Sequence, residues 1–313
     1  MHGHGGHGHG GHSHTGHSHT SLSPEADRKR LTAALALIVG FMVVEVVAGI
    51  LAHSLALLSD AAHMLTDAGA LLLSIVVIGL VARPASGNLT FGLRRAEILS
   101  AQANGATLLV LAALIVYEGV HRLVSPPRPA GTAILVVALV GIAVNLAATR
   151  QLARANRGSM NIEGSFQHLL TDLAAFVLTA VAGGVILVTG FTRADGIAAL
   201  LVAAIMSHAA YGLLRDSGRV FLEAAPEELD VTEISTAIGT HPHVASLHDL
   251  HVWEISSGFP SLSAHVLVHA DDDCHAIRRE LEAMLAERFR IEHTTLQVDH
   301  AARTSGLSIT PTT

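Results

Sequence analysis

The sequence predicts an α-helical membrane protein with six transmembrane helices and a C-terminal α+β domain. Three observations lead to this fold class. Half of the 313 residues are hydrophobic and only 14% are charged, whereas soluble domains carry about 25% charged residues. Six long apolar stretches follow one another between residues 31 and 214. After residue 221 the composition changes to that of a small soluble domain, with short alternating stretches typical of strands.

Composition also excludes several classes of protein. The formal net charge is −7 and Lys29 is the single lysine, so the chain offers no basic face for nucleic acid. Cys274 is the single cysteine, which excludes a disulfide framework and a cysteine-based zinc or iron–sulfur site. We interpret Cys274 as an ordinary small residue. Histidine is abundant, with 22 copies, and this favours metal chemistry.

The first 27 residues are predicted to be a disordered, His-rich cytoplasmic tail. Residues 2–19 hold eight histidines spaced by Gly, Ser and Thr, and such a segment cannot bury a core. It does not resemble a signal peptide, because a basic cluster follows it and no cleavage site is evident. Two roles stay open for the tail: delivery of metal to a site elsewhere in the chain, or passive buffering of metal.

Residues 28–215 are predicted to form the transmembrane domain. Each apolar stretch holds roughly 20 residues or more, enough to cross a hydrocarbon core about 30 Å thick. In a bilayer such stretches are helices, since a helix satisfies its backbone groups internally. The predicted spans are residues 31–52, 57–82, 96–120, 131–150, 163–190 and 195–214.

The distribution of basic residues predicts the orientation. If the N-terminus is inside, eleven basic residues lie on the inner side and three on the outer side, a positive-inside bias. Both termini are therefore expected in the cytoplasm. The inner residues are Arg28, Lys29, Arg30, Arg83, Arg94, Arg95, Arg150, Arg154, Arg157, Arg215 and Arg219, and the outer ones are Arg122, Arg128 and Arg193.

Residues 221–302 are predicted to form the cytoplasmic α+β domain, and residues 303–313 a disordered tail. Ser257-Gly258 supplies a turn between two strands, and Ile277, Leu281 and Leu285 recur at helical spacing. The order α-β-β-α-β predicts helices packed on a sheet. The predicted elements are a helix at 230–240, strands at 246–255 and 261–269, a helix at 273–289 and a strand at 294–300.

Two spans carry the same His-x-x-x-Asp unit. His63 and Asp67 lie in the second span, and His168 and Asp172 lie in the fifth. A spacing of four residues places both side chains on one helix face. Two imidazoles and two carboxylates from neighbouring helices suit tetrahedral zinc. The sequence therefore predicts an intramembrane metal site of these four residues.

The alternative is that these groups only hydrogen-bond between packed helices. An ionised group near the bilayer centre costs at least ~2.5 kcal/mol on insertion scales, and this favours a functional reading of two repeated pairs. Asp60 shares the face of His63 and is interpreted either as a partner of a ligand or as a proton carrier. The isolated residues Glu45, Asn104, Asn145 and His208 are more typical of helix packing.

The sequence carries no motif typical of an enzyme. It has no His-Glu-x-x-His, no Gly-x-Ser-x-Gly and no phosphate-binding glycine loop. Without an ATP motor, transport has to draw on an ion gradient. The competing hypotheses are a membrane-bound zinc sensor or storage protein without net transport, and an intramembrane hydrolase, for which no nucleophile signature is present.

Four segments resemble the cation diffusion facilitator family, especially its zinc-exporting members: residues 56–70, 91–105, 161–175 and 248–253. The resemblance runs in order from about residue 28 to 302. It implies a homodimer in the bacterial inner membrane that exchanges cytosolic Zn²⁺, and in some members Cd²⁺ or Co²⁺, for protons. It also implies a ferredoxin-like, metallochaperone-like cytoplasmic domain, and His63, Asp67, His168 and Asp172 as the transport site.

The resemblance implies a second zinc site in the cytoplasmic domain, formed by His248, His265, His275 and Asp299. Gln297 stands where some relatives carry another histidine, so this site is expected to bind one metal ion rather than two. Residues 83–96 hold no His, Asp or Cys, and no metal site is expected there. His241, His243 and His251 are further candidates. The alternative is that these histidines are ordinary solvated surface residues.

Overall fold

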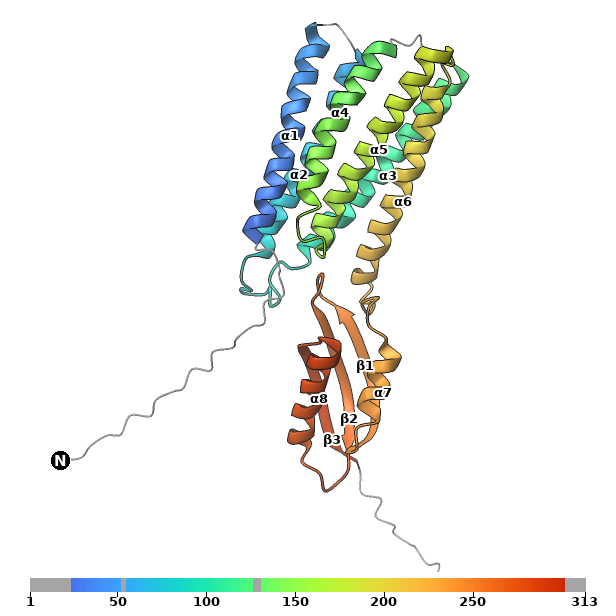
Figure 1. Ribbon diagram of the computed structural model, residues 1–313. Helices are drawn as coiled ribbons and strands as arrows, with labels where there is room; N and C mark the ends of the chain where they lie inside the picture. The colour runs from blue at the N-terminus through green and yellow to red at the C-terminus, as the bar shows by residue number, and fades with distance from the viewer. Residues whose placement is uncertain (1–23, 52–54, 126–130, 302–313) are drawn as a thin grey trace, which may run out of the picture.

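The structure, a computed structural model, describes residues 24–51, 55–125 and 131–301 (Figure 1). Six long helices form a bundle, and an α+β domain follows at one end of it. This confirms the predicted fold class. The helices of the bundle are α1 (Pro24–Leu51), α2 (Leu55–Val81), α3 (Ala96–Val124), α4 (Gly131–Leu152), α5 (Met160–Thr189) and α6 (Ala194–Phe221).

The helices extend beyond the apolar stretches that predicted them. Residues 24–27, which the sequence assigned to the tail, form the first turn of α1, because Asp27 makes tertiary contacts there. Its carboxylate accepts a hydrogen bond from the Asn156 N–H at 3.1 Å and lies 3.5 Å from the Arg30 guanidinium. The rest of the predicted N-terminal tail, residues 1–23, and the predicted C-terminal tail, residues 303–313, lie outside the described residues.

Helix α5 occupies a central place in the bundle, since it packs against α4, α6, α3 and α2. The other large contacts join α3 to α6 and α1 to both α2 and α4. Glycine permits the close approach of α3 and α6. A Cβ added at Gly196 would lie 3.0 Å from the carbonyl oxygen of Gly119 and 3.0 Å from Leu123 Cγ, tighter than ordinary packing tolerates.

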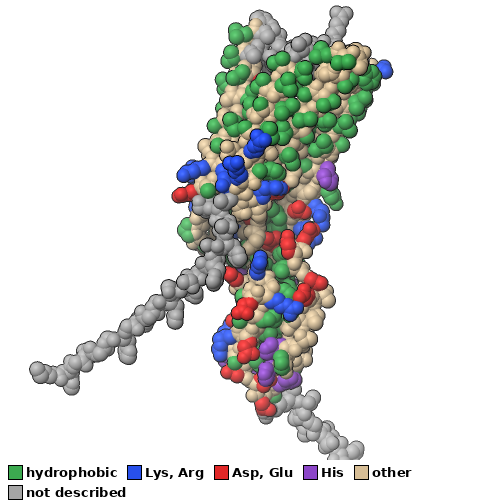
Figure 2. Space-filling view, in the orientation of Figure 1, with side chains coloured by type: hydrophobic (Ala, Val, Ile, Leu, Met, Phe, Trp, Pro, Cys, Tyr) green, Lys and Arg blue, Asp and Glu red, His purple; other side chains and the backbone are tan. Residues whose placement is uncertain are grey.

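The outer surface of the bundle is apolar. Val43, Leu72, Val110, Leu139 and Val181 all expose more than half of their surface, although a water-soluble protein would bury most such side chains. Hydrophobic side chains cover the bundle in Figure 2, while Lys and Arg gather at the end next to the C-terminal domain. All six helices are long and apolar enough to cross a membrane, so we describe the chain as an integral membrane protein.

The C-terminal domain follows the predicted order. Its elements are α7 (Val231–Gly239), β1 (Val244–Glu254), β2 (Pro260–Val268), α8 (Cys274–Phe289) and β3 (His293–His300). The strands form a sheet in the order β1-β2-β3, with β1 antiparallel and β3 parallel to β2. Ile234 and Ile238 of α7 and Leu281 and Leu285 of α8 pack on one sheet face against Val266. Within the described residues 226–301, no helix of this domain packs on the opposite sheet face.

Carboxylates cap both helices of this domain. Asp230 accepts the N–H groups of Thr232 and Glu233 at the start of α7, and Asp273 accepts those of Ala276 and His275 at the start of α8. These N–H groups favour the ionised carboxylate, so the hydrogen bonds from Ala276 and His275 lower the pKa of Asp273. Both caps satisfy N–H groups that a helix start leaves without partners.

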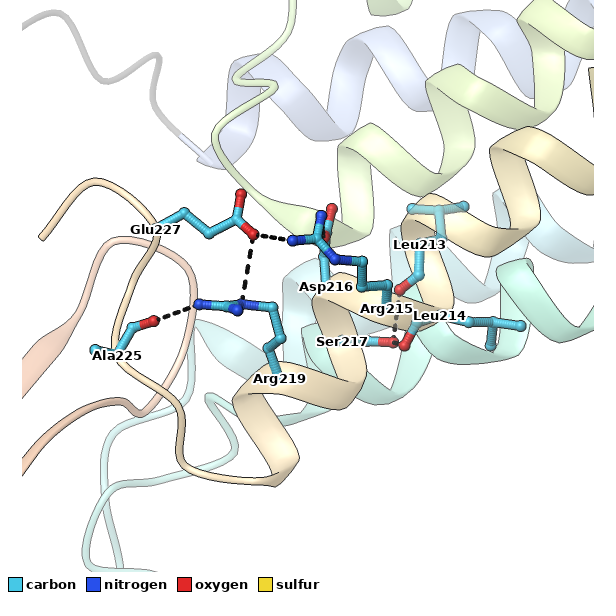
Figure 3. A network of polar contacts seen from close by, with 8 residues as sticks. All are labelled: Leu213, Leu214, Arg215, Asp216, Ser217, Arg219, Ala225 and Glu227. Atoms are coloured by element: carbon cyan, nitrogen blue, oxygen red, sulfur yellow. Dashed lines mark hydrogen bonds and ion pairs between the residues drawn. The ribbon is translucent and has the colours of Figure 1, made fainter.

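Ion pairs attach the segment after α6 to the end of that helix (Figure 3). The Arg215 guanidinium donates to Glu227 Oε1 at 2.5 Å, and Arg219 Nε lies 3.6 Å from the same oxygen. Arg219 also donates to the backbone oxygen of Ala225 at 2.9 Å. The C-terminal domain is therefore joined to α6 by side-chain contacts as well as by the chain itself.

Candidate metal centre

Three ligand-type side chains meet where α2 passes α5 inside the bundle. His168 Nε2 lies 2.8 Å from Asp67 Oδ1 and 3.9 Å from Asp172 Oδ2. One ligand atom of each residue lies within 4.8 Å of the other two. Among the described residues this is the only group of at least three His, Cys, Asp or Glu side chains with that geometry.

The antiparallel course of α2 and α5 produces this meeting. Toward the C-terminal domain the same two helices meet again, where the Ser74 and Ser165 hydroxyls lie 2.6 Å apart. The Asn161 side-chain amide donates to the backbone oxygen of Ser74 at 3.0 Å. Asn161, Ser165 and Ser74 are all almost fully buried. These contacts fix the register in which Asp67 faces His168.

The arrangement suits a divalent cation. His168 is 2% exposed and Asp67 is 9% exposed, so little water competes with the ligand atoms. The backbone oxygen of His168 accepts a hydrogen bond from the Thr171 hydroxyl at 2.7 Å. Two ligand atoms on one tetrahedral zinc, each at 2.0–2.2 Å from the ion, lie about 3.3 Å apart. The separations of 2.8 and 3.9 Å around His168 Nε2 bracket that value.

His63 does not join this group in the structure. Its side chain is exposed and lies one helical turn from Asp67 along α2. The structure thus brings together three of the four residues predicted for the transport site. The side chain of Asp60 lies outside the described part of the structure.

The isolated polar residues noted in the other spans have varied surroundings. Glu45, Asn104 and Asn145 are buried, and His208 is exposed. Asn145 donates to the backbone oxygen of Gly141 at 3.2 Å, and Asn104 packs against Gly164. These positions agree with helix packing. Cys274 is partly buried against the core of the C-terminal domain, as expected of a small apolar residue.

The sequence analysis did not identify Ser74, Asn161 and Ser165, although a signal is present. Asn161, Ser165, His168 and Asp172 follow at intervals of four, three and four residues, so they share one face of α5. Ser74 lies seven residues after Asp67 and shares its face of α2. A polar stripe along an otherwise apolar helix therefore marks the contact between these two helices.

A second set of ligand-type side chains lies in one row across the sheet. His248 of β1 pairs with His265 of β2, which pairs with Gln297 of β3. The rings of His248 and His265 are 5.2 Å apart. The Gln297 amide donates to Asp299 Oδ2 at 2.8 Å. His265 is partly buried and the other three side chains are exposed. Of the four predicted residues, His248 and His265 are therefore neighbours across the sheet, and Asp299 is linked to this pair through Gln297.

His275 lies apart from this row. It is exposed in the first turn of α8, the helix that covers the opposite face of the sheet. The further candidates pair with carboxylates instead. His241 Nε2 lies 3.3 Å from Glu280, His243 Nδ1 lies 3.1 Å from Asp272, and His251 Nε2 lies 3.9 Å from Asp249.

Comparison with known proteins gives a consistent result. Residues 31–222 match the family model of the cation efflux transmembrane domain, and residues 226–301 match that of the cation efflux protein cytoplasmic domain. In a solved structure, the metal-bound C-terminal domain of the CzcD transporter from Cupriavidus metallidurans, the matching segment is 38% identical. It covers 22% of this chain and 97% of that chain, with a TM-score of 0.22.

Curated relatives match over most of their length. The cadmium, cobalt and zinc/H(+)-K(+) antiporter of Bacillus subtilis is 34% identical over 88% of this chain and 90% of its own. The metal cation efflux system protein CzcD of Cupriavidus metallidurans is 39% identical over 89% of this chain and 88% of its own. The zinc transporter ZitB of Escherichia coli is 34% identical over 89% of this chain and 90% of its own. The chain therefore belongs to the cation efflux family, also called the cation diffusion facilitator family.

Proposed function

We propose that this protein exports Zn²⁺ from the cytoplasm in exchange for protons, by alternating access around His63, Asp67, His168 and Asp172. The group of Asp67, His168 and Asp172 between two membrane helices, of which the first two are buried and the third is partly buried, is the observation that carries the proposal. Carboxylates are costly inside a membrane and mark ion pathways there. The names of the relatives mention zinc, cadmium and cobalt, so we include Cd²⁺ and Co²⁺ as further cargoes.

His63 supplies the fourth ligand in this proposal. It stands four residues before Asp67 on the same face of α2, and its exposed side chain is free to change rotamer. Zinc in proteins is commonly four-coordinate and tetrahedral, and the three-residue group leaves one such position for His63. The ion would enter the three-residue group and draw His63 in as its fourth partner.

Exchange with protons follows from the chemistry of these ligands. Zinc requires a neutral imidazole and ionised carboxylates, so protons and metal compete for the same atoms. An unperturbed imidazole titrates near pH 6.5. Protons that arrive from the more acidic outer side would therefore weaken the ligands and favour release of zinc to that side.

The orientation rests on the basic residues at the ends of the helices. Lys and Arg gather at the end of the bundle next to the C-terminal domain (Figure 2), and the positive-inside rule assigns this end to the cytoplasm. We place both termini in the cytoplasm and the protein in the bacterial inner membrane, since the relatives named above are bacterial. The family model that matches the C-terminal domain is named for a dimer, and we propose a homodimer.

The cytoplasmic domain would carry a regulatory zinc site. His248, His265 and Asp299 lie on the uncovered face of the sheet, where a second copy of the domain can approach. His275 would then join them from the partner copy, because within one protomer it lies beyond the covered face. Zinc at this site would favour one arrangement of the two domains over another.

We expect replacement of Asp67 or Asp172 by Ala to abolish zinc transport. Each substitution removes a ligand and a charge that balances the ion. Loss of groups that only orient ligands already costs about 10–100-fold in metal affinity, so loss of a ligand should cost more than about 100-fold. Zinc flux into sealed vesicles that contain the purified protein measures the effect.

The matched control is Glu118→Gln, which changes an exposed carboxylate elsewhere in the bundle and should transport normally. The melting temperature in detergent shows whether each variant is folded. Transport at the wild-type rate by Asp67→Ala or Asp172→Ala would exclude the assigned site. Zinc binding without flux in the wild type would favour a sensor or storage protein.

Zinc uptake into inverted vesicles should depend on an acidic interior. In such vesicles the cytoplasmic face points outward, and protons leaving the interior would exchange for entering zinc. An ionophore is used to collapse the gradient at constant zinc. For a gradient of one pH unit and one proton per ion, we expect the steady-state accumulation of zinc to fall about tenfold. Uptake that does not change on collapse would indicate a uniporter.

Zinc binding by the C-terminal domain should depend on the row across the sheet. The buried core residues of this domain lie between Ile234 and Leu296, and the hydrophobic residues packed against them lie between Ala225 and Val298. The isolated segment 225–301 is therefore suitable for isothermal titration. The double variant His265→Ala, Asp299→Ala should lose one high-affinity site. The control double variant Glu292→Ala, His293→Ala removes the same chemical groups outside the row. Equal stoichiometry and affinity in all three proteins would show that the row is ordinary surface.

A further inference from the structure

The hairpin turn between β1 and β2 reaches the helix bundle at the start of α5. Figure 1 shows this end of the hairpin directed toward the bundle. The Ser257 N–H donates to Glu97 Oε1 of α3 at 2.7 Å, and the Met160 N–H of α5 donates to Ser257 Oγ at 3.0 Å. One serine of the C-terminal domain therefore contacts two membrane helices through hydrogen bonds.

Ser257 supplies a cap that α5 lacks on its own. The first N–H groups of a helix have no partners within it, and the residue before the helix usually satisfies one of them with its side chain. Ser159 occupies that position in α5 but makes no capping hydrogen bond. Its hydroxyl donates to Glu97 Oε2 at 2.9 Å instead. The N–H of Met160 is thus satisfied from another domain.

Glu97 is well placed to hold this contact. It is 8% exposed, and its two oxygens accept hydrogen bonds from Ser257 and Ser159. A carboxylate at a helix N-terminus also interacts favourably with the helix dipole. Within the turn, the Gly258 N–H donates to Glu254 Oε1 at 2.6 Å, and Gly258 adopts a φ of 71°, which favours glycine. The turn therefore has a specific backbone conformation, which presents Ser257 to the bundle.

The capped turn of α5 lies next to the α2–α5 contact on the domain side of the metal centre. Asn161, directly after Met160, and Ser165 form the contacts with Ser74 of α2. These contacts lie between the C-terminal domain and His168, because α5 runs away from that domain. In this structure the α2–α5 contact on the domain side of the metal centre is tightly packed, since Ser74, Asn161 and Ser165 are all almost fully buried.

We propose that Ser257 and Glu97 are positioning residues for transport, which hold the first turn of α5 in the place where Asn161 and Ser165 close the cytoplasmic side of the metal centre. This inference rests on the proposed function. The C-terminal domain keeps its attachment to α6 through Arg215, Arg219 and Glu227 (Figure 3). Rotation about that attachment would withdraw Ser257 from Met160 and release the first turn of α5.

The release can be measured without transport. The single cysteine is first removed by Cys274→Ser, and Ser74→Cys then places a thiol at the buried α2–α5 contact. Its reaction rate with a water-soluble methanethiosulfonate reports the population in which this contact is open. Ser257→Ala should raise the rate about fivefold, which corresponds to about 1 kcal/mol, the usual value of a helix cap.

Two variants serve as matched controls. Ser257→Thr retains a hydroxyl that can accept from Met160 and should restore the wild-type rate. Ser246→Ala removes an exposed hydroxyl from the end of β1 opposite the turn, and its rate should not change. An unchanged rate in Ser257→Ala would overturn the proposal, whether or not the wild-type protein transports zinc.

Transport kinetics show whether Ser257 positions α5 for transport or only stabilises the folded protein. A larger open population raises the fraction of protein that can accept zinc from the cytoplasm, so Ser257→Ala should lower the apparent KM by up to the same factor. A structural defect would lower the maximal rate and leave KM unchanged, and that result would contradict the proposal. Absence of zinc flux in the wild type would instead count against the proposed function.

Discussion

The contact between Asp67 and His168 is the constraint on which the rest of the membrane domain depends. A carboxylate inside an apolar bundle is stable only if it is paired, and the imidazole of the opposite helix pairs it at 2.8 Å. This requirement fixes how α2 passes α5, and the contacts of Ser74 with Asn161 and Ser165 follow in the same register. The partners that satisfy each other without metal are also the groups that can bind it.

The C-terminal domain is connected to this contact at two places. Ion pairs of Arg215 and Arg219 with Glu227 hold it to the end of α6, and Ser257 holds the start of α5. The first attachment follows the chain, whereas the second joins parts of the sequence that are far apart. A movement of the domain would therefore act, through the hydrogen bond of Ser257 with Met160, on the helix that carries His168 and Asp172.

Periodicity predicted most of this architecture, because long apolar runs and repeated His-x-x-x-Asp units are local features. Helix ends were less predictable. The first turn of α1 depends on the contact of Asp27 with Asn156, which no local pattern encodes. Ser257 was recognised only as a turn residue, because its partners Glu97 and Met160 come from other elements. His63 shares the helix face of Asp67, yet spacing along one helix does not determine whether a side chain faces the partner helix.

X-ray absorption at the zinc edge tests the central claim most directly. The protein would lack residues 2–19 and carry His265→Ala and Asp299→Ala. These changes reduce the zinc that histidines outside the membrane bind, and so their share of the absorption signal. The account predicts four nitrogen and oxygen ligands at about 2.0–2.2 Å, two of them imidazoles, and the loss of one imidazole on His63→Ala. The account would be contradicted if the parent protein bound no zinc. It would also be contradicted if the zinc site kept the same number of imidazole ligands after His63→Ala.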